Sequence, residues 1–237
     1  MPGRAATWAV VVAGGSGSRF GSYKQFALLG GRPLVDWSCE AAQGACAGFV
    51  LVVPASVEEA PVVARYREQG TRVVVGGATR AASVRAGLEA LPTGPQVIVV
   101  HDAARPLSSP RLWAAVVKAV EEGADGAVPC LAVADTIKQR QDDGRLVTLD
   151  RARLFASQTP QAFAAPALRA AHAGGREATD DAALVEALGG QVVHVEGEVT
   201  NLKITTHVDL VLAEALVAGG ALAHMQRPTS SRPGGFA

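Results

Sequence analysis

Short apolar runs rich in β-branched residues recur along the chain, and segments with helical spacing separate them. The apolar runs, which we expect to form strands, cover residues 8–12, 49–53, 72–75, 97–100 and 126–129. Helices are expected between them at residues 34–44, 56–69, 80–91 and 110–122. Strands that are apolar throughout are typical of parallel sheets with helices on both faces. The pattern predicts an α/β fold with a doubly wound, mostly parallel sheet.

Residues 134–160 interrupt this alternation with a polar stretch that is rich in charge. Within it, Asp143-Gly144 separates two segments of strand character at residues 136–138 and 146–149, which indicates a β-hairpin. An isolated hairpin is only marginally stable in water. We therefore expect a protruding arm that packs against another surface, and a second subunit would supply such a surface.

The α/β pattern then resumes and completes a predicted single domain, residues 1–225. Its further elements are expected to be helices at residues 179–188 and 207–217 and strands at residues 192–195 and 202–204. Residues 226–237 are rich in Pro, Ser and Gly, and this composition predicts a disordered tail.

Composition and charge narrow the class of protein. The 237 residues are 49% hydrophobic and 19% charged, as in globular proteins. The formal net charge is zero, so there is no overall basic field for nucleic acid, and local cations must hold any phosphate ligand. Cys39, Cys46 and Cys130 are scattered and odd in number, which favours a reducing cytoplasm over disulfides or a zinc site. With no signal peptide and no apolar run near ~18 residues, we expect a cytoplasmic protein without a membrane partner.

A glycine-rich loop follows the first apolar run. Gly14, Gly15 and Gly17 allow the backbone N–H groups to approach a phosphate chain, and Arg19 and Lys24 add positive charge to the same place. The loop lacks the Gly-Lys-Ser/Thr ending of a P-loop, because Ser18-Arg19 follows Gly17. We interpret it as a nucleotide-handling loop.

Two other interpretations of this loop stay open from the residues alone. A dinucleotide-binding fingerprint would have glycine at the position of Phe20, although Asp36 lies about 20 residues on, as a ribose-binding acid would. The second alternative is a flexible glycine turn without a ligand.

A second constellation, His101-Asp102-Ala103-Ala104-Arg105, ends the apolar run at residues 97–100. A carboxylate at the end of a buried strand faces the crevice where ligands of such sheets bind, and there Asp102 can hold Mg²⁺ against phosphate oxygens. Arg105 is near enough to serve a second anion. Alternatively, Asp102 caps the next helix and Arg105 forms a surface ion pair. We expect His101 to be packed or hydrogen-bonded rather than to act as a base.

Taken together, the motifs resemble the 2-C-methyl-D-erythritol 4-phosphate cytidylyltransferase family of the non-mevalonate isoprenoid pathway. The resemblance runs from about Trp8 to Leu216, and the order and spacing of the motifs carry it. These motifs lie at residues 13–19, 24–26, 76–84, 101–106, 135–138, 150–151, 158–161, 179–182 and 201–205. The resemblance implies a Rossmann-like nucleotidyltransferase fold and transfer of CMP from CTP to a polyol phosphate, with release of pyrophosphate.

The resemblance also implies residue roles. Arg19, Lys24 and Lys203 would be the catalytic cations that neutralise charge on the α-phosphate and the leaving pyrophosphate, and no protein nucleophile is needed. Asp102 would bind Mg²⁺ or another divalent cation. The nucleotide would be bound by Ala13, Gly14, Gly15, Gly17, Gly77, Ser83 and Asp102.

In this family the hairpin is an arm exchanged between two subunits, which implies a homodimer with composite active sites. The acceptor phosphate would be held by Arg105, Thr136, Arg151, Thr159 and Thr179. Taken singly, Thr136 also fits an ordinary strand residue, Thr179 a helix N-cap and Arg151 a solvated charge.

The chain departs from the family pattern at two positions. Ala78 replaces a polar or acidic residue, so base contact there would come from the backbone, and the neutral Thr200 argues against a second metal-binding carboxylate. Two alternative functions are a ribitol-5-phosphate cytidylyltransferase of the same build and a non-catalytic nucleotide-binding protein.

Overall fold

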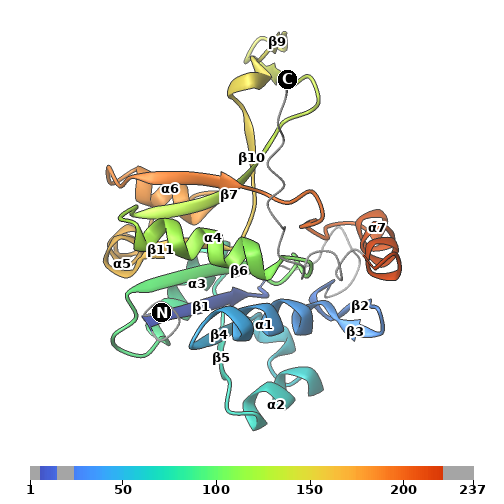
Figure 1. Ribbon diagram of the computed structural model, residues 1–237, viewed down its shortest axis with the longest axis vertical. Helices are drawn as coiled ribbons and strands as arrows, with labels where there is room; N and C mark the ends of the chain where they lie inside the picture. The colour runs from blue at the N-terminus through green and yellow to red at the C-terminus, as the bar shows by residue number, and fades with distance from the viewer. Residues whose placement is uncertain (1–5, 15–23, 221–237) are drawn as a thin grey trace, which may run out of the picture.

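A central sheet organises the molecule in the computed structural model, which describes residues 6–14 and 24–220 (Figure 1). Its eight strands are β1 (Thr7–Val12), β4 (Gly48–Val53), β5 (Arg72–Val75), β6 (Val97–Asp102), β7 (Gly126–Ala132), β10 (Phe155–Ser157), β11 (Gln161–Ala164) and β12 (Val192–Glu196). The order from one edge is β5-β4-β1-β6-β11-β7, and β7 also pairs with β10 and β12. Only β10 and β11 pair antiparallel to their neighbours among the described strands of this sheet. The largely parallel α/β sheet expected from the sequence is confirmed.

Helices cover both faces of the sheet, as the apolar strands require. One face packs against α1 (Leu34–Ala45), α2 (Pro61–Glu68) and α4 (Pro110–Glu121), and the other against α3 (Arg80–Glu89), α5 (Ala165–Ala173) and α6 (Asp181–Glu186). Successive side chains of β1 alternate between the two cores: Ala9 and Val11 join the first, Val10 and Val12 the second. A strand buried on both sides in this way is apolar at successive positions, which is the pattern of residues 8–12 in the sequence.

A third, smaller cluster lies beside the sheet. Helix α7 (His207–Ala218) packs there against the short hairpin of β2 (Leu28–Leu29) and β3 (Arg32–Pro33). Ile204 is fully buried in this cluster. Its burial anchors the segment that carries Lys203.

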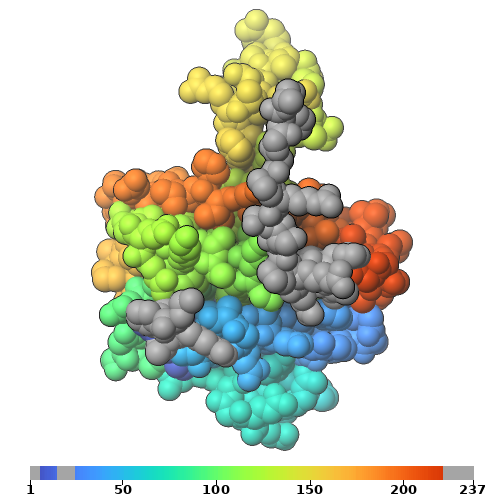
Figure 2. All heavy atoms as spheres, viewed as in Figure 1, coloured from blue at the N-terminus to red at the C-terminus, as the bar shows by residue number. Residues whose placement is uncertain are grey.

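The hairpin arm is present and projects from the body of the molecule (Figures 1 and 2). It contains β8 (Lys138–Arg140) and β9 (Leu146–Thr148), and the 3₁₀ turn η4 (Arg151–Arg153) follows. Gly144 has φ +83°, a left-handed conformation that glycine adopts without steric cost, so the Asp143-Gly144 turn signal is confirmed. All residues of β8, β9 and β10 are exposed in this chain.

Three details differ from the sequence-based expectations. The predicted strand at residues 202–204 is wrong: this segment has no regular structure, and Ile204 N donates to Ala104 O (2.8 Å) instead of joining a ladder. The helix expected at residues 56–69 is divided into η3 (Ala55–Val57) and α2, because Pro61 lacks an N–H and starts a new helix. Strands β2, β3, β10 and β11 and helix α5 were not predicted.

Within the described residues, no helix combines the length and the hydrophobicity needed to cross a membrane. The predicted tail at residues 226–237 lies outside the described part of the chain.

Candidate active site

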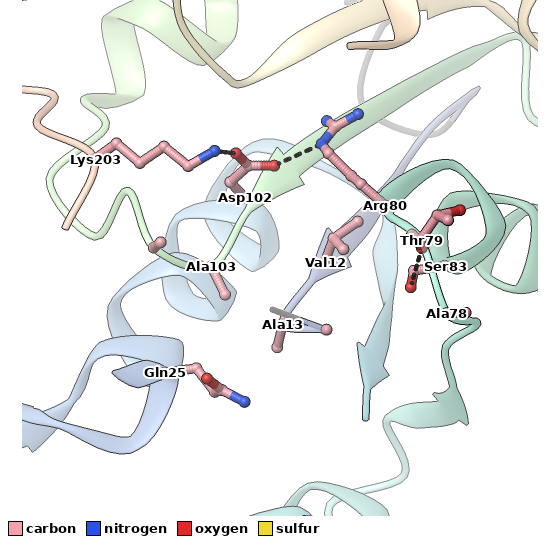
Figure 3. Close-up of a pocket in the computed structure, with 12 residues that line it drawn as sticks. Val12, Ala13, Gln25, Ala78, Thr79, Arg80, Ser83, Asp102, Ala103 and Lys203 are labelled. Atoms are coloured by element: carbon pink, nitrogen blue, oxygen red, sulfur yellow. Dashed lines mark hydrogen bonds and ion pairs between the residues drawn. The ribbon is translucent and has the colours of Figure 1, made fainter. Parts of the chain in front are cut away.

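The candidate site is a cleft of about 330 Å³ at the carboxyl edge of the parallel strands (Figure 3). Val12 and Asp102 are register partners at the ends of β1 and β6, so the ends of these two strands lie side by side. Strand β11 runs opposite to β6, which brings its start, and Thr159 before it, to the same edge. Ligands of open α/β sheets bind at this edge. The cleft is lined by Val12, Ala13, Gly14, Gln25, Ala78, Thr79, Arg80, Ser83, Asp102, Ala103, Ala104 and Lys203.

One wall of the cleft is the loop that enters α3. Thr79 caps this helix by accepting a hydrogen bond from Ala82 N (3.0 Å), and Ser83 Oγ donates to Thr79 O (2.9 Å). Gly77 packs so closely here that a Cβ would lie 2.5 Å from the Ala82 Cβ. The loop therefore needs glycine at this point, and it holds the buried Ser83 hydroxyl at the wall of the cleft.

Asp102 is the charged centre of the site. Its Oδ2 lies 2.6 Å from Lys203 Nζ, and its Oδ1 lies 3.2 Å from Arg80 Nε (Figure 3). Burial by itself would raise the pKa of Asp102, but the positive charges of Arg80 and Lys203 outweigh it and hold the pKa well below its ordinary value. The carboxylate is therefore ionised throughout the physiological pH range.

The donor set around Asp102 fits Mg²⁺. Among the described residues, no cluster of three or more His, Cys, Asp or Glu side chains forms a complete protein cage for a metal. Mg²⁺ commonly binds through one or two carboxylates together with substrate phosphates and water. A single ionised carboxylate with lone pairs to spare, at the end of β6, matches that requirement.

Lys203 reaches the cleft from a loop that is anchored on both sides. Ile204 is buried after it, and before it Asn201 Nδ2 donates to Thr159 O (2.9 Å). The Lys203 side chain itself is 42% exposed. Its backbone is thus held while the ammonium group keeps access to a ligand.

His101 and Thr159 form a buried support for Asp102. Asp102 N donates to Thr159 Oγ1 (3.0 Å), and this hydroxyl lies 3.2 Å from His101 Nδ1. Burial lowers the pKa of His101 to about 4, so the ring is neutral at pH 7. The network then assigns Nδ1 as the acceptor from Thr159 and Nε2–H as the donor to Arg105 O (3.1 Å). His101 also packs on the Trp113 ring at 5.0 Å, as expected for a packed residue.

This burial of neutral His101 predicts an acid-sensitive fold. The unfolded state takes up a proton near pH 6.5 and the folded state only near pH 4, so the stabilisation is present above pH 6.5 and is lost as the pH falls to 4. The loss amounts to about 3 kcal/mol. Urea unfolding at pH 7 and pH 4 should show a smaller decrease in the free energy of unfolding for His101→Asn than for the wild type. His194→Asn, at an exposed position, should behave as the wild type; equal decreases in all three proteins would contradict the prediction.

The other residues predicted for the acceptor lie in different surroundings. Arg105 donates to Asn201 O (2.8 Å) and Ser157 O (3.2 Å), so in this structure its guanidinium connects the loop of Asn201 to the end of β10. Thr179 is exposed, and Asp180 rather than Thr179 caps α6. Thr136 and Arg151 lie on the arm, where both are exposed and Arg151 donates to Ala134 O.

The structure therefore brings part of the predicted set together. Five of the predicted residues line the same cleft: Ala13, Gly14, Ser83, Asp102 and Lys203. Gly77 and Thr159 contact members of that group. Lys24 begins the 3₁₀ turn η2 (Lys24–Phe26), whereas Gly15, Gly17 and Arg19 lie outside the described residues.

Arg80 pairs with both Asp102 and the buried Asp181, and this pairing was not expected from the sequence. Both residues belong to motifs of the resemblance, Arg80 after the Gly76-Gly77 loop and Asp181 after Thr179. Their membership of these motifs was the only sequence signal that either residue has a role. The ion pair between them could not be predicted from the sequence, because 101 positions separate the two residues.

Comparisons with known proteins agree with this geometry. The family model described as 2-C-methyl-D-erythritol 4-phosphate cytidylyltransferase matches residues 7–219. A protein of that name from Rubrobacter xylanophilus is 46% identical over 219 residues, covering 89% of this chain and 94% of the relative. Another from Nocardia farcinica is 45% identical over 214 residues, covering 88% and 93%. The crystal structure of 2-C-methyl-D-erythritol 4-phosphate cytidylyltransferase from Thermus thermophilus is similar with a TM-score of 0.74 and 39% identity, covering 89% of this chain and 98% of that chain. This chain therefore belongs to the 2-C-methyl-D-erythritol 4-phosphate cytidylyltransferase family.

Proposed function

We propose that this enzyme transfers CMP from CTP to 2-C-methyl-D-erythritol 4-phosphate, releasing pyrophosphate, as a step of non-mevalonate isoprenoid biosynthesis. The observation that carries the proposal is the pair of Asp102 and Lys203, 2.6 Å apart, in a cleft that Gly14 and Ser83 also line. A cation and an ionised carboxylate at this edge suit a polyphosphate ligand with a divalent cation.

The reaction needs positioning and charge neutralisation. A phosphate oxygen of the acceptor attacks the α-phosphorus of CTP in line, forming a new P–O bond as the bond to the β-phosphate oxygen breaks and pyrophosphate leaves. Lys203, with Arg19 and Lys24, neutralises the charge that develops on the transferring and leaving groups. Mg²⁺ bound at Asp102 would withdraw charge from the phosphate oxygens. Gly77 and Ser83 are proposed to contact the cytosine.

The arm is proposed to complete the site of a second copy. Its exposed apolar residues, Leu146, Val147 and Phe155, would be buried by a partner subunit. In such a homodimer, Thr136 and Arg151 of one subunit would hold the acceptor phosphate in the other, together with Arg105, Thr159 and Thr179. The free thiols of Cys39, Cys46 and Cys130 support a location in the reducing cytoplasm.

Pyrophosphate release by the purified protein tests the proposal. With Mg²⁺ present, CTP and methylerythritol phosphate should release pyrophosphate, while ATP, GTP or UTP in place of CTP should not. Release with ribitol 5-phosphate alone would keep the mechanism and change the acceptor. Absence of release with both acceptors would contradict the proposed function.

A further inference from the structure

A chain of charged groups continues from the cleft into the interior. Arg80, the first residue of α3, uses Nε for Asp102 Oδ1 (3.2 Å) and Nη1 for Asp181 Oδ2 (2.7 Å). Asp181, the first residue of α6, is fully buried, and its Oδ1 lies 2.9 Å from Nε2 of His172 on α5. The Arg80 guanidinium therefore links α3, α6 and the end of β6.

The two cations on Asp102 are held very differently. The guanidinium of Arg80 is planar, its donors have a fixed geometry, and a buried carboxylate holds its other end. The ammonium of Lys203 lies at the end of a flexible side chain that is 42% exposed. Consequently Arg80 can define the orientation of the Asp102 carboxylate, while Lys203 can turn away from it without leaving that carboxylate unpaired.

We propose that Arg80 is a positioning residue for the transfer reaction: fixed by Asp181, it orients the Asp102 carboxylate and frees Lys203 to turn towards the substrate phosphates. This inference rests on the proposed function for the roles of Asp102 and Lys203. Arg80 acts through these two residues and is given no contact with the substrate. The contact between His172 and Asp181 holds the Asp181 carboxylate in place, and this carboxylate in turn holds Arg80.

Two conservative variants test the proposal. In Arg80→Lys, the single ammonium group of lysine replaces the planar guanidinium and cannot pair with both Asp102 and Asp181. We expect kcat to fall about 30-fold, while the KM for CTP changes less than about threefold. In Asp181→Asn the shape is kept but the charge that fixes Arg80 is lost, and kcat should fall about tenfold. Because both act through one contact, the double variant should lose no more kcat than Arg80→Lys alone.

Arg85→Gln is the matched control. Arg85 lies further along the same helix and pairs with Glu177 (3.1 Å), remote from Asp102 in the hydrogen-bond network. Its kcat should stay within about twofold of the wild type. Melting temperatures of all variants establish that rates are measured on folded protein. If Arg80 had a purely structural role, Arg80→Lys and Asp181→Asn would lower the melting temperature without both lowering kcat.

A crystal structure of Asp181→Asn supplies a readout that does not depend on turnover. The Asp102 carboxylate should be rotated from its wild-type orientation. An unchanged carboxylate, or folded variants with wild-type kcat, would overturn the positioning role. Wild-type protein that releases no pyrophosphate would instead contradict the proposed function, and the carboxylate orientation would still decide the role of Arg80.

Discussion

Asp102→Asn is expected to lower kcat by at least about 10³-fold while the protein stays folded. The substitution keeps the size of the side chain but removes the negative charge that lies between Arg80 and Lys203. An amide is a poor ligand for Mg²⁺, and without the carboxylate Lys203 loses the partner that holds it in the cleft. Arg80 still pairs with Asp181, so the interior keeps its principal ion pair.

Pyrophosphate release at saturating substrates measures this effect, and circular dichroism with a melting curve verifies the fold. Asp36→Asn is a suitable control, because Asp36 is also a shielded carboxylate in an ion pair, with Arg65, but lies on α1 outside the cleft lining. The control should retain wild-type kcat. A folded Asp102→Asn enzyme with more than about a tenth of the wild-type rate would refute the role assigned to this carboxylate.

Arg151→Ala is expected to raise the KM for methylerythritol phosphate about 50-fold and to leave the KM for CTP within about twofold. Arginine binds phosphate through paired hydrogen bonds, and its loss removes contacts to the acceptor alone. Steady-state kinetics with each substrate varied in turn separates the two constants. Arg153→Ala, on the same turn η4, is the control and should change neither. A rise in the KM for CTP instead would show that the arm serves the nucleotide.

Mixing Asp102→Asn subunits with Arg151→Ala subunits tests arm exchange directly. If each site combines Asp102 of one subunit with Arg151 of the other, a heterodimer of Asp102→Asn and Arg151→Ala subunits contains one site with both residues intact. Such a heterodimer should recover about half of the wild-type activity at low acceptor concentration. If refolding the mixed chains recovers no activity, each arm serves the active site of its own subunit and arm exchange is contradicted.

The sequence by itself determined most of the helices and strands of the sheet and the chemistry at the ends of the strands. Unbroken apolar runs such as residues 8–12 can be buried only between two layers of helices, so they indicated a doubly wound sheet before any contact was known. The Asp143-Gly144 turn and the polar segments around it likewise indicated the arm. Asp102 was placed at the ligand edge because it ends a buried strand. These are local signals, carried by residues close together in the chain.

Only the tertiary structure decided which distant residues meet. Strand β11 has weak strand propensity of its own and forms because β6 and β7 pair with it on both sides. Lys203 reaches Asp102 from a loop and not from the expected strand, because burial of Ile204 beside α7 fixes the path of the backbone. Arg80 and Asp181 meet because α3 and α6 cover the same face of the sheet. Such contacts depend on how the layers pack, and packing between segments 101 residues apart leaves no periodic trace in the chain.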